Sequence, residues 1–158
     1  MQKIKHKIIA NNWNCFSGIR EIFNYFKVIK KLEKERIANE FHVDLYQEDF
    51  DRLQHFINKH LSTDLVLPES LVILKQAQEL DIRQIVISDF PIADKLEKLD
   101  LTGYFDKTIG CADEIKCWKP HFSILEYVGQ IPYPFVVIGD RYDTDGKLFD
   151  LFKESFIG

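Results

Sequence analysis

The chain has 158 residues, of which 46% are hydrophobic and 29% are charged, and its formal net charge is −4 at pH 7. This length suits one domain with room for a small insertion, and the composition is that of a globular protein rather than a disordered one. The acidic balance argues against a nucleic-acid partner, because no basic face stands out to neutralise phosphates. No apolar run approaches the ~18 residues that span a bilayer, so we expect no membrane insertion.

The N-terminus and the cysteines bear on the cellular compartment. The opening residues, MQKIKHKIIANN, include lysines but no apolar core of a signal peptide, so we expect a cytoplasmic protein. The three cysteines are Cys15, Cys111 and Cys117. Their odd number and the absence of a CxxC pair fit a reducing compartment and no structural zinc.

The first predicted element is a short strand within residues 3–10, KIKHKIIA. It leads into Asn12, Trp13 and Asn14. A strand that ended in DxD would place two carboxylates at this tip. Here the same positions carry two uncharged amides.

Residues 17–62 contain two helical patterns with no strand between them. The apolar positions at helical spacing are Ile19, Ile22, Phe23, Phe26 and Ile29 in the first pattern and Phe50, Leu53, Ile57 and Leu61 in the second. We expect this hairpin to be a small helical cap inserted after the first strand. The remaining residues, 1–16 and 63–158, would then form the core domain.

Helices and strands alternate in the rest of the chain. The predicted order is a helix at 68–80, a strand at 83–88, a helix at 92–101, a strand at 107–111, a helix at 121–130 and a strand at 133–139. The second and last of these strands are almost continuously apolar, which is typical of parallel strands buried on both faces. The pattern therefore predicts an α/β fold with a parallel sheet between helices.

Polar residues follow the ends of these strands. They are Asn12 and Asn14, then Ser88 and Asp89, then Lys119 in a nearby loop, then Asp140. Because ligands of open α/β sheets bind outside the carboxyl ends of the strands, we expect these side chains to lie at one edge. A hydroxyl, a lysine and carboxylates together suit a phosphate oxyanion held beside a divalent cation.

Three segments resemble motifs of the haloacid dehalogenase superfamily of phosphatases and related hydrolases. They are IVISD (85–89), KCWKPHFSIL (116–125) and IGDRYDTDG (138–146), in the order and approximate spacing of that family. Each motif alone is weak, and only their combination carries the resemblance. It covers nearly the whole chain and implies a Rossmannoid parallel sheet sandwiched by helices.

The resemblance also implies a role for each matching residue. Ser88 and Lys119 would be catalytic positions, and together with Asp89 they would bind the substrate. Asp140 and Asp145 would hold Mg²⁺, a cation that takes oxygen ligands and keeps several waters. A small phosphorylated molecule, or another anion, is the expected ligand.

The first motif departs from the family pattern. KIIANNWNCF aligns without a gap, so Asn12 falls on the nucleophilic aspartate, Asn14 on the second catalytic position, and Cys15 and Phe16 on the two residues that follow. A carboxamide is not a comparable nucleophile, and an amide does not exchange a proton near pH 7. Loss of the carboxylate would also weaken Mg²⁺ binding.

Several interpretations of single residues stay open. The strand at 3–10 could be unrelated to the family motif, or the true motif could lie upstream. Asp143 and Asp145 could cap the final helix instead of binding a metal. Cys15 could replace the nucleophile, although its position should direct it away from the phosphate.

Three hypotheses for the function follow. The first is an active Mg²⁺-dependent phosphatase acting on a small phosphorylated metabolite. The second, which the chemistry favours, is a catalytically impaired relative: a non-catalytic anion-binding or regulatory protein that keeps the fold. The third is a damaged or truncated gene product, because only a short helix follows the fourth motif. The sequence indicates neither the substrate nor the oligomeric state.

Overall fold

The structure, a computed structural model, describes residues 23–24, 26–34, 47–129, 131 and 134–154. This part of the chain is α/β, with mostly helices and a small parallel sheet. Residues 26–34 are helical and precede the longest helix with defined ends, α3 (Gln47–His60). The other elements are η1 (Thr63–Leu65), α4 (Pro68–Glu79), β1 (Ile85–Ser88), α5 (Ala93–Lys98), η2 (Thr102–Tyr104), β2 (Lys107–Gly110), η3 (Cys111–Ile115), α6 (Ser123–Val128), η4 (Tyr142–Gly146) and α7 (Lys147–Glu154).

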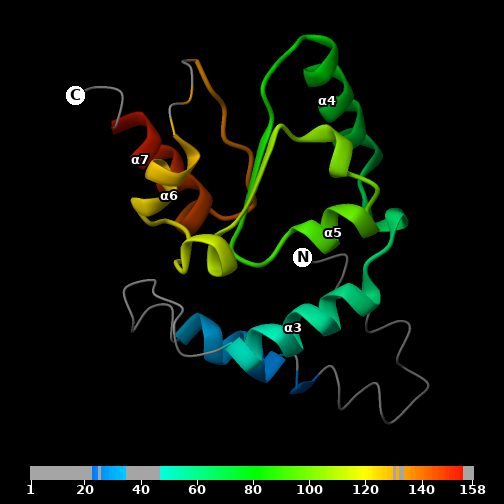
Figure 1. The fold of residues 1–158 in the computed structure, drawn as a ribbon, viewed down its shortest axis with the longest axis vertical. Helices are drawn as coiled ribbons and strands as arrows, with labels where there is room; N and C mark the ends of the chain where they lie inside the picture. Colours follow the sequence, from blue (N-terminus) through cyan, green and yellow to red (C-terminus); the bar gives the residue numbers. More distant parts are fainter. Residues whose placement is uncertain (1–22, 25, 35–46, 130, 132–133, 155–158) are drawn as a thin grey trace.

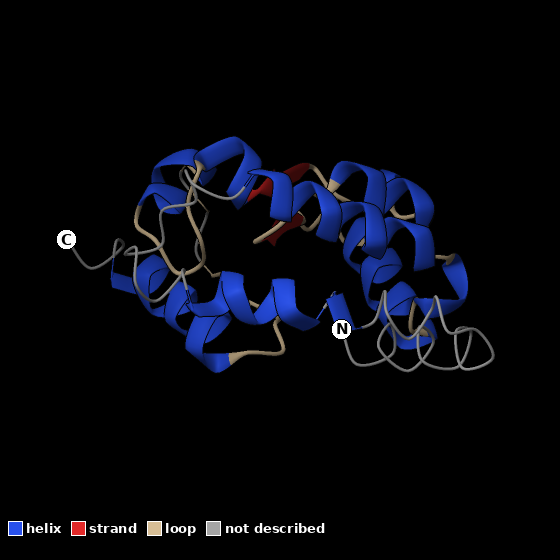
Figure 2. Cartoon of the chain, turned by 90° about the horizontal axis from the view of Figure 1, so that it is seen from below, coloured by secondary structure: helices blue, strands red, loops and turns tan. Residues whose placement is uncertain are grey.

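The sheet pairs β1 with β2 in parallel, and Ser88 lies opposite Gly110 at its carboxyl end. The strands lie between α4 on one side and α6 and α7 on the other (Figures 1 and 2). Both strands and the helix before them form where the sequence predicts. Pro68 occupies the first turn of α4, where its missing N–H costs nothing.

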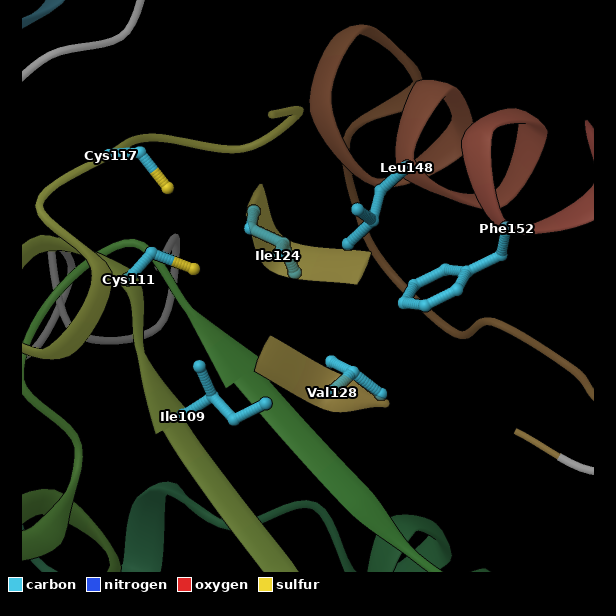
Figure 3. Close-up of a cluster of buried hydrophobic side chains, with 7 residues drawn as sticks. All are labelled: Ile109, Cys111, Cys117, Ile124, Val128, Leu148 and Phe152. Atoms are coloured by element: carbon cyan, nitrogen blue, oxygen red, sulfur yellow. The ribbon is translucent and has the colours of Figure 1, made fainter. Parts of the chain in front are cut away.

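One core cluster lies on the side of the sheet covered by α6 and α7. Figure 3 shows Ile109 of β2 directed toward Ile124 and Val128 of α6, with Leu148 and Phe152 of α7 completing the cluster. Burial of apolar side chains of this size is the main favourable contribution to folding. It fixes the last two helices against the strands.

A second core cluster lies beyond the carboxyl ends of the strands. Leu32, Leu53 and Phe56 of the two hairpin helices are buried against Ala112 and Trp118, and Phe90 packs at the margin. Ala112 follows β2 and Phe90 follows β1, so the hairpin helices lie next to the edge where the strands end (Figure 1). That the hairpin acts as a cap stays a prediction.

The strand predicted at 133–139 is wrong for the described part of this segment. Residues 135–139 form no strand, and the described sheet consists of β1 and β2 alone. The side chains of Val136 and Ile138 are 83% and 82% exposed, whereas Phe135 contacts Phe149 and Phe152 of α7. An apolar run becomes a strand only where a neighbouring strand pairs with its backbone, and composition does not reveal that neighbour.

The predicted helices after the strands are correct in place but too long. The helix predicted at 92–101 is α5 (Ala93–Lys98), and the one predicted at 121–130 is α6 (Ser123–Val128). Gly129 follows α6 with φ of 76° and ψ of −164°, a backbone conformation that is open essentially to glycine alone and that ends the helix. Among the described residues, no helix is long and apolar enough to cross a membrane.

Candidate functional site

The turn after β1 connects three parts of the chain. The Ser88 hydroxyl accepts a hydrogen bond from the Phe90 N–H at 3.2 Å, which shapes the turn. The Asp89 carboxylate accepts the Lys119 N–H at 2.7 Å, and the Asp89 carbonyl accepts the Ala112 N–H at 3.1 Å. Asp89 therefore holds both the Lys119 loop and the start of η3 against the end of β1.

Lys119 reaches from this loop to the segment after residue 139. Its ammonium lies 2.6 Å from Asp145 Oδ1 and 3.4 Å from the Ile87 carbonyl oxygen. The two charged side chains are only 13% and 14% exposed. Water screens such a pair less than a surface ion pair, so removing one partner would leave a poorly solvated charge.

Asp145 is fixed on its other side as well. Its second oxygen, Oδ2, accepts the Arg141 N–H at 3.3 Å. A Cβ at Gly139 would overlap the Asp145 side chain, so a larger residue at 139 would displace this carboxylate. The sequence offered helix capping as an alternative role for Asp145, but its side chain binds Lys119 and Arg141 instead.

Arg141 connects this edge to the hairpin. Its guanidinium binds Asp143 through two nitrogens, at 3.1 and 2.6 Å, and lies 3.8 Å from Glu33. Asp143 raises the pKa of Arg141 further above its ordinary value. The contact that the structure gives for the Asp143 carboxylate is therefore this ion pair with Arg141.

The structure brings together some of the predicted site residues and not others. Asp89, Lys119 and Asp145 are joined by hydrogen bonds, and Ser88 lies directly beside them in β1. Asp140 is exposed. Asn12 and Asn14, like Cys15, lie outside the described residues, so their predicted roles stay predictions.

The described carboxylates near Lys119 are engaged in other contacts than those with a metal ion. Asp145 is already bound to an ammonium and a backbone N–H, and no group of three or more His, Cys, Asp or Glu side chains in the described ranges is placed to hold a metal ion. A hard cation needs several oxygen ligands. The described carboxylates do not supply such a set of ligands by themselves.

The sequence did not single out Lys95, a half-buried residue of α5. Its ammonium lies over the Phe90 ring, 5.2 Å from the ring centroid, and the carboxylates of Asp113 and Asp89 act on it electrostatically. Lys95 lies within a helix and not directly after a strand, so the strand-end pattern does not include it.

A cavity of about 660 Å³ opens elsewhere, on the helical hairpin, lined by residues between Asn24 and Val28 and between Asp51 and Lys59. Of the predicted site residues that the structure describes, none lines it. The site at the strand ends is therefore identified by its polar contacts and not by this cavity. Comparisons with protein-family models, curated proteins and solved structures found no match.

Proposed function

We propose that this chain is a haloacid-dehalogenase-like protein of the phosphatase type that retains an anion-binding site but is catalytically impaired. The observation that carries the proposal is the junction at Lys119. Its N–H binds Asp89 at 2.7 Å and its ammonium binds Asp145 at 2.6 Å. These residues come from the three segments whose sequences resemble the family motifs.

The junction supports anion binding through two kinds of group. The Ser88 hydroxyl accepts the Phe90 N–H and keeps its own proton to donate to an anion. Lys119 contributes a positive charge, with its ammonium bound to Asp145 and its backbone N–H to Asp89. Charge-assisted hydrogen bonds of this kind are stronger than neutral ones. A phosphate or a similar tetrahedral anion is the ligand that this set of donors suits.

The impairment follows from Asn12. In the alignment an amide occupies the position of the attacking carboxylate, and an amide oxygen does not form an acyl-phosphate at neutral pH. Binding and charge stabilisation can leave a small residual rate when the nucleophile is lost. We therefore expect binding without appreciable turnover.

The test is hydrolysis of an aryl phosphate, with Mg²⁺ present, by the wild type and by Asn12→Asp. We expect no turnover above background for the wild type and a gain on the order of 10² or more for Asn12→Asp. Asn24→Asp makes the same change at an exposed hairpin position and should gain nothing. Mass spectrometry of each sample would detect deamidation of Asn12, which would create the same aspartate.

Each outcome is decisive for the proposal. Robust turnover by the wild type would favour the alternative, an active phosphatase, and overturn the impairment. Activity in Asn12→Asp that is lost in Asn12→Asp/Lys119→Met would support both the alignment and the junction. No activity in any variant, together with no anion binding by the wild type, would overturn the assignment.

A further inference from the structure

Lys95 carries a cation that the surrounding protein does not neutralise. The residue is half-buried in α5, and its ammonium lies 5.2 Å from the centroid of the Phe90 ring. In the part of the chain that the structure describes, this ammonium donates no hydrogen bond and forms no ion pair. The contact with the ring face offsets only part of the cost of removing a charge from water.

Burial and the nearby charged groups set the direction in which the pKa of Lys95 shifts. Burial lowers the pKa of Lys95 from its ordinary value of 10.5 to about 8, although Asp113 and Asp89 act in the opposite direction. Two helices pack against α5: α3, which contacts it through the uncharged Asn58, and η2, which contains Thr102, Gly103 and Tyr104 and no charged side chain. On α5 itself, Asp94 accepts the amide N–H of Asn58 and Lys98 donates to its carbonyl, and the remaining charged residue is Glu97, which is exposed.

The other cations at this edge have partners. Lys119 is bound to Asp145 at 2.6 Å, and Arg141 is bound to Asp143 at the same distance. A ligand anion would compete with a carboxylate for either of them. Lys95 presents a charge for which no carboxylate competes within hydrogen-bonding distance.

Asp89 places Lys95 and Lys119 in the same neighbourhood. Its carboxylate accepts the Lys119 N–H at 2.7 Å. The same carboxylate is one of two that act electrostatically on Lys95. Both lysines therefore flank the turn that follows β1, where the hydroxyl of Ser88 also lies.

From this arrangement we propose that Lys95 is the second cation of the anion site, and that with Lys119 it selects ligands whose terminal group carries two negative charges, such as a phosphate monoester. This inference rests on the proposed anion site. It adds a residue from outside the family motifs and a charge requirement for the ligand. A singly charged anion needs fewer positive donors, so Lys95 would increase its binding affinity less.

A direct test measures binding of inorganic sulfate by titration calorimetry to the full chain and to its variants. Sulfate keeps its two charges between about pH 6 and pH 10, so any pH dependence belongs to the protein. Lys95→Met should weaken sulfate binding about tenfold or more at about pH 7, which is the size of one charged hydrogen bond. Lys95→Arg keeps the charge and should retain most of the affinity, and Lys75→Met, an exposed change on α4, should change nothing.

The pH profile separates a binding role from a structural one. Wild-type affinity for sulfate should fall above about pH 8, with proton uptake on binding, because the anion favours the charged form of Lys95. Lys95→Arg should not show this fall, since its guanidinium stays charged. Methanesulfonate, a singly charged tetrahedral anion, should lose less affinity than sulfate when Lys95 is replaced by Met.

Different results would overturn the role of Lys95 and the existence of the anion site. If the wild type binds no sulfate at about pH 7, both are wrong. If the wild type binds sulfate and Lys119→Met weakens it while Lys95→Met does not, only the role of Lys95 is wrong. A fall in affinity above pH 8 that persists in Lys95→Arg would also overturn that role. Thermal unfolding of each variant verifies that it is folded.

Discussion

The ammonium of Lys119 and the carboxylate of Asp145 lie 2.6 Å apart at the carboxyl end of the sheet, where their side chains are 13% and 14% exposed. The pair joins a loop after η3 to the turn before α7, two segments 26 residues apart in sequence. Because the same ammonium also lies 3.4 Å from the Ile87 carbonyl oxygen, the pair connects the C-terminal segment to β1.

Breaking this pair from one side should destabilise the fold. Lys119→Met leaves Asp145 with a poorly solvated charge, and we expect a loss of about 2 kcal/mol in the free energy of unfolding. Lys119→Met/Asp145→Asn removes both charges and should lose less than the sum of the two single changes. Urea unfolding of the four proteins measures the coupling energy.

An exposed ion pair provides the matched control. Arg52 and Glu48 of α3 lie 3.6 Å apart with side chains 72% and 90% exposed. Arg52→Met should change stability by less than about 0.5 kcal/mol. Equal effects of Lys119→Met and Arg52→Met would contradict the structural importance of the Lys119–Asp145 pair.

The sequence predicted those parts of the fold that depend on local patterns. Pro68 and the apolar spacing after it locate α4, and the β-branched run before Ser88 locates β1, because both signals lie within the element itself. The segment 135–139 has equally strong composition, yet Val136 and Ile138 are exposed. Its conformation depends on a pairing partner that no local pattern specifies.

The sequence likewise predicted part of the candidate site and not the rest. Ser88, Asp89 and Lys119 were identified because they follow predicted strands or lie in a nearby loop, and the carboxyl ends of parallel strands lie at one edge of a sheet. The partner of Asp145 was not predictable, because a carboxylate can bind a metal, a helix end or an ammonium, and only tertiary contacts decide among them. Lys95 was missed because its approach to the site depends on how α5 packs on the Phe90 ring.

Lys95 should lower the stability of the folded protein at neutral pH, although it contributes to the proposed anion binding. Its pKa in the folded state is about 8, below the ordinary 10.5, so between these values the unfolded chain binds more protons and stability rises with pH. Below about pH 8 the buried charge costs the folded state on the order of 1–2 kcal/mol after allowance for solvent screening. We therefore expect Lys95→Met to be more stable than the wild type at pH 7.

Unfolding in urea at about pH 7 and about pH 10 measures this effect. The advantage of Lys95→Met should shrink at the higher pH, where the wild-type amine is neutral in the fold. A variant less stable than the wild type at pH 7 would mean that Lys95 contributes a favourable contact, contrary to its unpaired charge.

The two described cysteines should be unreactive in the folded protein. Cys111 and Cys117 are 0% and 2% exposed, and their sulfurs lie at the core cluster beside Ile109 and Ile124 (Figure 3). Burial raises the pKa of both thiols, that of Cys117 to about 11, so little of the reactive thiolate forms at neutral pH.

Alkylation by iodoacetamide at about pH 8, followed by peptide mass spectrometry, tests this expectation. Both cysteines should be modified in denaturant and neither in the native state over the same time. Peptide-level assignment is needed because Cys15 lies outside the described residues. Rapid native labelling of Cys111 would show that the α6–α7 cluster opens or packs differently.

The central claim is that a tetrahedral anion binds at the end of β1 beside Lys119, next to the amide of Asn12. A crystal structure of the protein grown with tungstate, whose metal atom is located by its anomalous scattering, tests this most directly. We predict the anion within hydrogen-bonding distance of Lys119 Nζ, the Ser88 hydroxyl and the Lys95 ammonium, with the Asn12 side chain facing it. Tungstate bound elsewhere, or Asn12 directed away from Ser88 and Lys119, would contradict the account.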